Sequence, residues 1–343
     1  MTEIAIVILN WNTKNYLEKF LPTLIENSDL PNVDIYVVDN GSIDDSVAFL
    51  KSEHPQINLI EFPENNGFTA GYNKALQQIN ARYYLLLNSD IEVTPNWLEP
   101  LKETMEHEEN VAACMPKIKS YDKPEFFEYA GAAGGFIDKY GYPFCRGRIM
   151  NVVEEDRGQY NDEKEIFWAT GACMMVRADI FHQMGGFDND FFAHMEEIDL
   201  CWRMQNAGYK IYYTHKSTIY HIGGGTLPSE SPFKLFLNFR NNLYLLYKNL
   251  PNKHLFKILT IRMFLDYASA FLFLIKGRPK KFLSVIKAHL TFFKNYSILK
   301  NKRKETPGNE KYFPRQIVSK SMLYEFFINK RRYYRQLIDK KTK

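Results

Sequence analysis

The sequence predicts an α/β fold with a mostly parallel, Rossmann-like sheet flanked by helices, followed by a basic helical extension. Two patterns predict the sheet: short, continuously apolar runs typical of strands buried on both faces, and apolar residues at helical spacing after each run. Strands and helices that alternate through short connections form parallel βαβ units. With 343 residues, the chain is long enough for two domains, or for one large α/β domain with an appendage.

Four strands are predicted in the first ninety residues, at residues 4–9, 35–38, 59–62 and 83–87. Helices are expected between them, the first through the apolar residues at 16–24, the second at 44–52 and the third at 73–79. Because each unit is a strand, a polar loop and a helix, the carboxyl ends of these strands should meet at one edge of the sheet.

Polar residues follow the predicted strands at that edge. Asn10 and Asn12 end the first strand, Asp39 ends the second, and the sequence NSD, which finishes at Asp90, follows the fourth. Taken singly, each has a structural explanation, because Asn and Asp favour helix caps and turns. Together they predict a nucleotide and metal site, since a divalent cation at this edge needs oxygen ligands such as Asp90 to hold a diphosphate. His221, ahead of three glycines at a later strand end, is either structural or donates an imidazole to a metal.

A glycine-containing loop follows the third strand. Residues 65–71 are expected to form this loop, which includes Gly67 and enters a helix at Asn73. It resembles a phosphate cradle, because glycine lets backbone N–H groups approach an anion at the start of a helix. It matches neither a Walker loop nor a GxGxxG fingerprint, so it supports the site only together with the neighbouring strand ends.

The pattern is less regular after residue 93. We expect a helix at 95–108, irregular strands and a flexible rim over 111–160, a strand at 167–177 that holds Gly171 close to another group, a turn at 184–188, and a strand near 210–214.

Three carboxylates lie at the predicted start of a further helix that ends at Gly208. Asp199 is placed to pair with Arg203 one turn later, and for this residue we prefer that structural role. Glu196 and Glu197 are about 100° apart on a helix, so at most one of them shares the face of Asp199. Neighbouring carboxylates raise one another's pKa, which would suit a general base.

Charge is distributed unevenly along the chain. Residues 233–343 contain 26 Lys or Arg and 5 Asp or Glu, a net charge of +21, whereas residues 1–232 have a net charge of −17. We therefore expect a catalytic domain over 1–232 and a basic, aromatic helical region over 233–343. Such a tail suggests an anionic partner, either a membrane leaflet or a nucleic acid.

The tail is expected to meet a membrane without crossing it. Residues 233–247 should form a helix that packs on the body, and residues 255–275 are apolar but interrupted by Lys257, Arg262 and Asp266. Three charges argue against a spanning helix. We prefer an interfacial amphipathic helix on an anionic leaflet over a soluble helical bundle, and we expect no nucleic-acid partner.

Cysteine usage and the first residues predict a cytoplasmic protein, and the basic tail would place it at the inner face of the cytoplasmic membrane. The four cysteines lie about thirty residues apart and are expected to be free thiols. Residues 1–9 lack the basic start, long apolar stretch and cleavage site of a signal peptide.

With these motifs in order, the chain resembles the family 2 glycosyltransferases of the GT-A fold. It is most similar to the rhamnosyltransferase-like members that build bacterial surface polysaccharides such as O-antigen and capsule. The resemblance covers residues 4–250 and is carried by VILNWN, VVDNGS, NNGFTAGYN, LLLNSD, TGACMMVR, GGFDNDFFAHMEEIDLCWR and YHIGGG. It implies transfer of a sugar, with inversion, from a nucleoside diphosphate sugar such as a UDP- or dTDP-sugar, for example dTDP-rhamnose, to a hydroxyl of a lipid-linked or growing saccharide.

The resemblance also implies roles for single residues. Asn10 and Asn12 would border the base pocket, Asp39 would contact the base or ribose, and Gly67, Asn73 and Asn88 would help to hold the nucleotide. Asp90 would bind Mg²⁺ or Mn²⁺ near His221. Glu196 and Glu197 align with the family's Glu-Asp pair, whose second position is the general base, so this sequence has Glu in place of Asp there. Asn88 likewise replaces the first Asp of the family's DxD motif.

Two alternatives are weighed against a transferase. A sugar nucleotidyltransferase shares the sheet and the metal carboxylate, but it opens with a glycine-rich basic loop where this chain has NWN. A non-catalytic nucleotide-binding module with a basic tail fits the replaced Asn88 and Glu197, but not the retained Asp39, Asp90 and His221.

Overall fold

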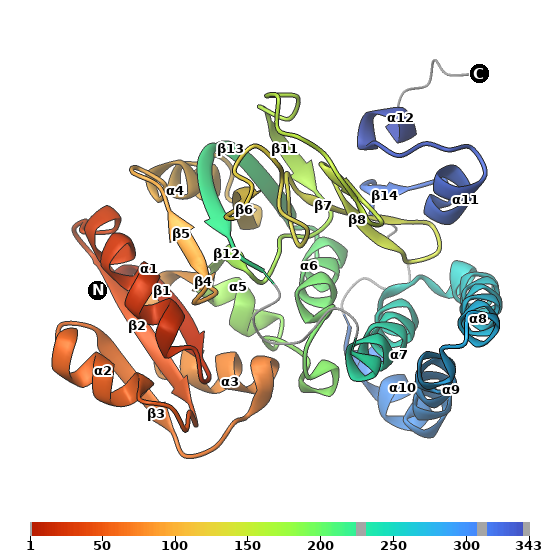
Figure 1. Ribbon diagram of the computed structural model, residues 1–343, viewed down its shortest axis with the longest axis horizontal. Helices are drawn as coiled ribbons and strands as arrows, with labels where there is room; N and C mark the ends of the chain where they lie inside the picture. The colour runs from red at the N-terminus through yellow and green to blue at the C-terminus, as the bar shows by residue number, and fades with distance from the viewer. Residues whose placement is uncertain (1, 224–230, 307–313, 339–343) are drawn as a thin grey trace.

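The computed structural model of the chain describes residues 2–223, 231–306 and 314–338. Strands and helices alternate through the first hundred residues (Figure 1). The elements of this part are β1 (Thr2–Asn10), α1 (Lys14–Asn27), β2 (Val33–Asn40), α2 (Ser46–Glu53), β3 (Asn58–Phe62), α3 (Gly67–Leu76), β4 (Ala81–Leu87), β5 (Ile91–Val93) and α4 (Glu99–Glu106). The predicted α/β class is confirmed.

Further strands and two helices follow before the tail. They are β6 (Val111–Ser120), β7 (Gly135–Asp138), β8 (Pro143–Cys145), β9 (Arg148–Ile149), β10 (Val152–Val153), β11 (Glu163–Ile166), β12 (Cys173–Arg177), α5 (Ala178–Gln183), α6 (Glu196–Asn206) and β13 (Lys210–His221). A short 3₁₀ helix, η1 (Asn189–Phe191), precedes α6.

The central sheet is mostly parallel, as predicted. Among the described residues its strand order is β11-β13-β6-β12-β4-β1-β2-β3, and β5 pairs with the end of β13. The neighbours from β4 to β3 are parallel, and so are β6 and β13. By contrast, β12 runs antiparallel to both β4 and β6, and β11 and β5 each pair antiparallel with β13. Since β2 and β3 lie on one side of β1 and β4 on the other, the switch point where such sheets bind ligands lies between β1 and β4.

Buried apolar runs account for the parallel strands. Residues 4–8 of β1 and 83–87 of β4 are each at most 2% exposed, so these strands are covered on both faces. All four strands predicted in this part are confirmed, each with up to two further residues at an end.

The helix after β3 begins earlier than predicted. The expected loop over residues 65–71 is wrong beyond Asn66, because α3 already starts at Gly67. Its glycines serve close packing: a Cβ atom added at Gly71 would lie 3.0 Å from the side chain of Leu9. The glycines that suggested a loop therefore lie on the buried face of α3.

Residues 111–160 are also better ordered than predicted. The expected flexible rim is wrong, because β6 is a central strand whose first eight residues are buried, and β7 to β10 belong to a second sheet. Pro116 and Lys117 interrupt the apolar run of β6 and so concealed it. The Lys117 side chain is buried and pairs with Asp156 at 2.9 Å.

Three other predicted elements differ in length. Within the helix expected at 95–108, only the residues of α4 are helical. Within the strand expected at 167–177, only the residues of β12 form a strand. The strand expected at 210–214 continues to His221 as β13.

The carboxyl-terminal region packs directly on the body. Its elements are α7 (Pro232–Asn249), α8 (Asn252–Ile275), α9 (Pro279–Lys294), α10 (Tyr296–Glu305), β14 (Ile317–Val318), α11 (Met322–Phe327) and α12 (Tyr334–Ile338). The predicted helix at 233–247 is confirmed as α7, which lies against α6 (Figure 1). The predicted boundary at residue 232 coincides with the start of α7, yet one hydrophobic core includes residues on both sides of it.

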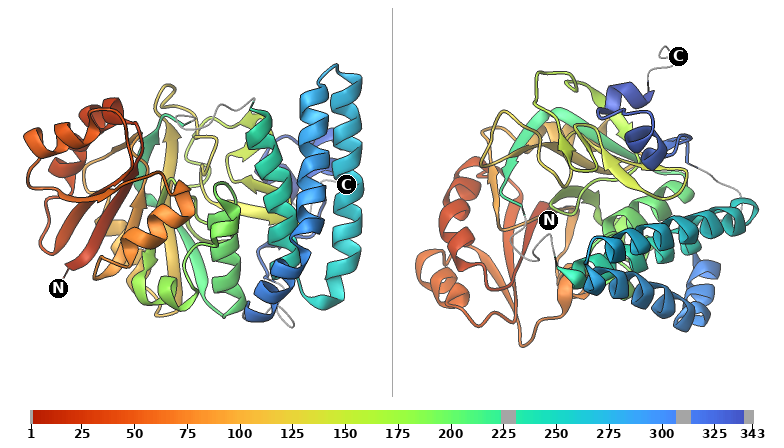
Figure 2. Two further views of the ribbon diagram at one scale, coloured as in Figure 1. Left: turned by 90° about the horizontal axis from the view of Figure 1, so that it is seen from below. Right: turned by 45° about the vertical axis from the view of Figure 1, so that its right-hand side comes forward.

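The tail is not purely helical. In β14, Ile317 and Val318 pair in parallel with β7, and the backbone N–H of Tyr334 in α12 donates to Glu154 at 3.2 Å. The second sheet, in the order β10-β9-β8-β7-β14, therefore needs a strand from the tail. Figure 2 shows α8 and α9 side by side as the outermost layer on the opposite side of the molecule from β3.

Candidate active site

A buried carboxylate and imidazole lie at the carboxyl edge of the central sheet. The Oδ1 atom of Asp90 is 3.1 Å from Nε2 of His221. They meet because β5, directly after Asp90, pairs with the end of β13. The backbone N–H of Gly223 donates to Oδ2 of Asp90 at 3.2 Å. Two residues predicted as metal ligands are thus brought together, although 131 positions separate them. Gly224 and Gly225, the last two glycines of the run after His221, lie outside the described residues.

Glu128, which the sequence analysis missed, lies on the other side of the imidazole. Its Oε1 is 3.6 Å from Nδ1 of His221, and both side chains are buried. Burial alone would lower the pKa of His221, but its hydrogen bond with Asp90 and the nearby carboxylate of Glu128 raise that pKa to about 10. Burial acts to raise the pKa of Asp90, but the hydrogen bond from His221 outweighs it and lowers the pKa. Glu128 therefore orients the imidazole toward Asp90.

The ends of β1 and β2 form a second polar group. Asn10 is completely buried, and its Nδ2 donates to Oδ1 of Asp39 at 2.9 Å and to Oγ of Ser42 at 3.1 Å. The backbone N–H of Ser42 donates to Oδ2 of Asp39 at 3.0 Å. Asn10 and Asp39 are also register partners in the sheet. The two residues predicted to border the nucleotide therefore share one hydrogen-bond network.

Asn12 fixes the neighbouring loop. Its backbone has a positive φ of 55°, and its Oδ1 accepts a hydrogen bond from the backbone N–H of Ile43 at 2.8 Å. The Oγ1 of Thr13 lies 2.6 Å from Oδ1 of Asn10 and 2.9 Å from Oγ of Ser89. Thr13 thus links the end of β1 to the NSD turn across the switch point of the sheet.

The structure places Gly67 and Asn73 in supporting positions. Gly67 has a φ of +75°, which favours glycine, and a Cβ added there would lie 3.0 Å from the ring of Phe192. The Nδ2 of Asn73 donates to the carbonyl of Phe187 at 2.8 Å, and its Oδ1 accepts from the backbone N–H of Phe187 at 2.9 Å. The Asn73 amide therefore ties α3 to the loop before α6.

The turn just before β12 connects the metal residues with the acidic helix. The backbone N–H of Asn88 donates to the carbonyl of Ala172 at 2.9 Å, and Asn88 Nδ2 lies 3.5 Å from Nε2 of His221. At the adjacent Gly171, an added Cβ would lie 3.3 Å from the ring of Phe68 and 3.9 Å from Cβ of Glu197. The expectation that Gly171 approaches another group is confirmed, and that group includes Glu197.

Glu196 and Glu197 open α6 with unusual electrostatics. The Oε2 atoms of both are buried and lack a hydrogen-bond partner among the described residues. Burial raises the pKa of Glu197 to about 7, against the opposing effect of backbone hydrogen bonds. Burial and the charge of Glu197 raise the pKa of Glu196 well above its usual range. Glu197 is thus poised to accept a proton near neutral pH.

Asp199 behaves differently from its two neighbours. Its Oδ2 accepts from Nε of Arg203 at 2.8 Å, which confirms the predicted pair, and Lys248 of α7 approaches it at 2.9 Å. Burial would raise the pKa of Asp199, but Lys248 and Arg203 lower it. The expectation that all three carboxylates raise one another's pKa is therefore wrong for Asp199, because cations from α6 and α7 surround it.

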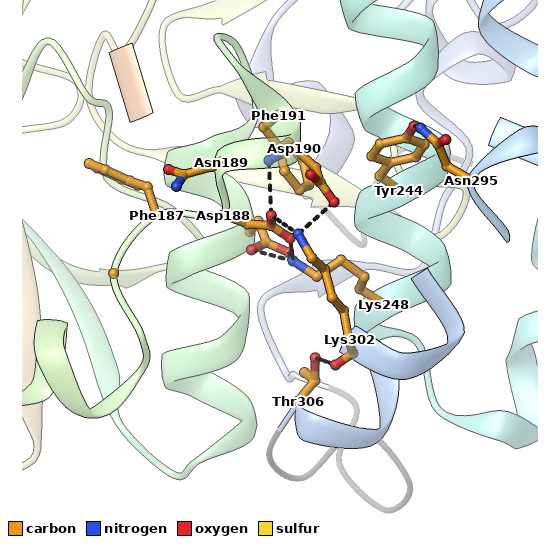
Figure 3. A network of polar contacts seen from close by, with 12 residues as sticks. Phe187, Asp188, Asn189, Asp190, Phe191, Tyr244, Lys248, Asn295, Lys302 and Thr306 are labelled. Carbon is orange, nitrogen blue, oxygen red and sulfur yellow. Dashed lines mark hydrogen bonds and ion pairs between the residues drawn. The ribbon is translucent and has the colours of Figure 1, made fainter. Parts of the chain in front are cut away.

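Helices of the tail hold the loop that precedes α6. Figure 3 shows Lys248 of α7 and Lys302 of α10 meeting at Asp188, with Lys302 also 2.5 Å from Asp190. Lys248 pairs with Asp188 at 2.5 Å. Asn241 Nδ2 donates to the carbonyl oxygens of three residues, Phe191, Ala193 and His194. The tail therefore sets the backbone that leads into Glu196 and Glu197.

Replacing Lys248 with Met should lower the free energy of unfolding by roughly 3–5 kcal/mol, because it leaves the carboxylates of Asp188 and Asp199 buried with less compensation. Urea denaturation checks this prediction. Lys300→Met on the exposed side of α10 is the matched control and should change little. Equal midpoints for the Lys248 variant and the wild-type chain would contradict a stabilising role for this network.

The donor set at Asp90 suits Mg²⁺ or Mn²⁺. Within the described ranges, no group of three or more His, Cys, Asp or Glu side chains is arranged to hold a metal. A cation that bridges a diphosphate needs only one or two protein ligands, since phosphate oxygens and water complete its coordination. The Asp90 carboxylate therefore fits such a cation, and the His221 imidazole can join it once the cation displaces the proton that Nε2 shares with Asp90.

Comparison with known proteins agrees with this geometry. Residues 5–185 match the model of glycosyl transferase family 2. N-acetylglucosaminyl-diphospho-decaprenol L-rhamnosyltransferase of Mycobacterium tuberculosis is 23% identical over 236 residues, which cover 64% of this chain and 76% of that protein. The similarity is therefore spread over most of both chains.

Solved structures show the same fold at low identity. GalNAc-T7 with UDP, GalNAc and Mn²⁺ has a TM-score of 0.57 and 13% identity, and covers 74% of this chain, which in turn spans about half (49%) of that one. The mannosyltransferase PcManGT of Pyrobaculum calidifontis, in complex with GDP-Man and Mn²⁺, has a TM-score of 0.51 and 12% identity over 90% of this chain and 84% of that one. These likenesses show the GT-A fold. Because the family model also matches more than half of its residues, the chain belongs to glycosyl transferase family 2.

Proposed function

We propose that this chain is an inverting, metal-dependent glycosyltransferase of cell-surface polysaccharide synthesis. It moves a sugar from a nucleoside diphosphate donor, either a UDP- or a dTDP-sugar such as dTDP-rhamnose, to a hydroxyl of a lipid-linked or growing saccharide. The observation that carries the proposal is the position of Glu197, which lies beside the turn at Gly171 and Ala172. The same turn accepts a hydrogen bond from Asn88, and Asn88 lies beside the pair formed by Asp90 and His221. The name of the mycobacterial relative, a rhamnosyltransferase for a diphospho-decaprenol acceptor, supports the donor and acceptor classes.

Each residue group has a distinct task in this proposal. Asn10 and Asp39 bind the nucleoside at the ends of β1 and β2, with Asn12 and Gly67 shaping the pocket. Asp90 and His221 would hold Mg²⁺ or Mn²⁺, which neutralises charge on the diphosphate leaving group. Glu197 accepts the proton of the acceptor hydroxyl as its oxygen attacks the anomeric carbon, and the carbon–oxygen bond to the diphosphate breaks. Inversion follows from attack opposite the leaving group.

A cavity beside the metal residues could receive the acceptor. A volume of about 340 Å³ lies beside Glu128 and Ile222 and is lined by Phe126, Phe127 and Tyr129. Aromatic side chains and a few polar groups are typical of sites that bind small polar molecules. We propose that the acceptor saccharide binds in this cavity. We also propose that the enzyme is cytoplasmic and works at the inner face of the membrane.

Incubation with a panel of nucleoside diphosphate sugars and Mn²⁺ tests the function. A transferase should release the nucleoside diphosphate, slowly to water and faster to an acceptor. Formation of a nucleotide sugar from a nucleoside triphosphate and a sugar phosphate would instead identify a nucleotidyltransferase. Binding without turnover of any donor in the panel would favour a non-catalytic module.

Replacing Asp39 with Ala should weaken donor binding by roughly 10- to 100-fold, because hydrogen bonds to a charged group contribute about 1.5–3 kcal/mol. The maximal rate should change less, since Asp39 touches the nucleoside and not the reacting carbon. Calorimetric titration with the nucleoside diphosphate checks this. Asp34→Ala, at the opposite end of the same strand, is the control. Unchanged affinity in the Asp39 variant would remove this residue from the donor site.

A further inference from the structure

The outer side of α8 is apolar and exposed. Large apolar residues lie there along five turns of the helix and are 45–83% exposed: Phe256, Phe264, Tyr267, Phe271, Leu272, Leu274 and Ile275. By length and composition, α8 is also the one helix in the described part of the chain that could cross a membrane, with a mean hydropathy of 1.8 over its most apolar window. A solvated helix rarely exposes so many aromatic and aliphatic side chains together. We call this surface the outer face of α8.

Two of the three charges that interrupt α8, Arg262 and Asp266, are buried against the body, away from this face. Arg262 Nε donates to Oδ1 of Asp266 at 2.8 Å, and Nε2 of His289 in α9 lies 3.2 Å from the other carboxylate oxygen. The Arg262 guanidinium also lies over the ring of Tyr142, 3.9 Å from its centre. Arg262 is 4% exposed and Asp266 is fully buried. These charges bind α8 to the body, so they do not weaken the apolar outer face.

The same contacts keep α8 from crossing a bilayer. A spanning helix would have to leave Tyr142 and His289 and carry the Arg262–Asp266 pair into hydrocarbon, which is strongly unfavourable. Packed against α9, α8 can instead lie along a surface. Leu283, Leu290 and Phe293 of α9 are 55–65% exposed and extend the apolar area beside it.

Basic residues surround the apolar area. Lys253 and Lys257 lie near the start of α8, Lys276 directly follows its end, Lys280 lies in the first turn of α9, and all four are exposed. Residues 252–294 are all described, and their one acidic residue is the buried Asp266. Two copies of such a surface would bring like charges together, which disfavours a dimer through this face. An anionic leaflet complements both the lysines and the apolar centre.

From this arrangement we propose that the outer face of α8, together with the exposed edge of α9, docks flat on an anionic lipid bilayer, so that α8 lies in the interface and does not span it. This docking proposal deepens the proposed function and rests on it in one respect, because a lipid-linked acceptor would reach the enzyme at the membrane surface. The sequence-based preference for an interfacial helix gains a defined face and orientation.

Flotation of the full chain with vesicles tests the proposal. The chain should float with vesicles of phosphatidylcholine and phosphatidylglycerol, much less with phosphatidylcholine alone, and less as salt screens the lysines. Phe264→Ser combined with Phe271→Ser should lower partitioning at least about tenfold, since both apolar anchors are lost. Ile43→Ser, which alters a residue that is 93% exposed beside α2, should leave partitioning unchanged.

Other outcomes would overturn the docking proposal. Absence of binding to anionic vesicles, equal loss with Ile43→Ser, or retention after an alkaline carbonate wash, as for a spanning helix, would each do so. A dimer in solution that the two Ser substitutions dissociate, without vesicle binding, would assign the face to a second copy. Donor hydrolysis measured without vesicles reports separately on the proposed function, and the double Ser variant should retain it.

Discussion

Replacing Glu197 with Gln should slow sugar transfer by about 10²- to 10⁴-fold while nucleotide binding stays close to that of the wild-type chain. The substitution keeps the size and hydrogen-bonding shape of the side chain but removes the basicity that the acceptor hydroxyl needs, and loss of a general base typically has an effect of this size. Steady-state kinetics with saturating donor and acceptor checks the rate. Titration with the nucleoside diphosphate checks binding.

The neighbouring carboxylate and the pH profile are the controls. Glu196→Gln should retain more activity than Glu197→Gln, because the proton acceptor is assigned to the second position. Burial raises the pKa of Glu197 to about 7, and a base acts only when deprotonated. The rate should therefore rise about tenfold per pH unit below that pKa and level off above it. An inactive Glu196→Gln variant beside an active Glu197→Gln variant would move the base to Glu196.

Replacing Asp90 with Ala should lower activity by about 10³-fold or more. Asp90 and His221 are the groups placed to hold the divalent cation, and a metal contributes several kcal/mol by stabilising charge that develops on the diphosphate. A donor assay with Mn²⁺ measures the loss. Excess chelator should reduce the wild-type chain to a similar level, and Asp122→Ala, at an exposed carboxylate after β6, should not.

Full wild-type activity in excess chelator would contradict metal dependence. If Asp90 binds the cation, the Asp90→Ala variant should be inactive, and its affinity for the nucleotide should no longer respond to Mn²⁺. Thermal unfolding of the variant distinguishes a lost ligand from a lost fold, because Asp90 also accepts a hydrogen bond from Gly223.

Local patterns predicted the parts of this molecule that depend on neighbours in sequence. The apolar runs of β1 and β4 indicated their strands because burial on both faces selects apolar residues continuously. Together with the run of β2, they located Asn10, Asp39 and Asp90 at one edge of the sheet. The Asp199 to Arg203 pair could be predicted because it lies within one helical turn.

Interactions between distant segments could not be predicted in this way. Glu128 lies in a stretch without a strong pattern and reaches His221 only through the fold. The hydrogen bonds of Asn241 to the loop before α6 form only because α7 packs against α6. Lys257, Arg262 and Asp266 argued in the sequence only against a spanning helix. The fold shows that Arg262 and Asp266 pair with each other and with the body, so these two charges face inward. A one-dimensional pattern records which charges exist and not which way they face.

The most direct test of the account is a crystal of this chain grown with Mn²⁺ and a nucleoside diphosphate, with the metal located by its anomalous scattering. We expect one manganese peak within bonding distance of Asp90 and His221, in contact with the diphosphate, and the nucleoside beside Asn10 and Asp39. A nucleotide bound elsewhere, or a manganese peak away from Asp90, would contradict the assignment of this sheet edge as the donor site.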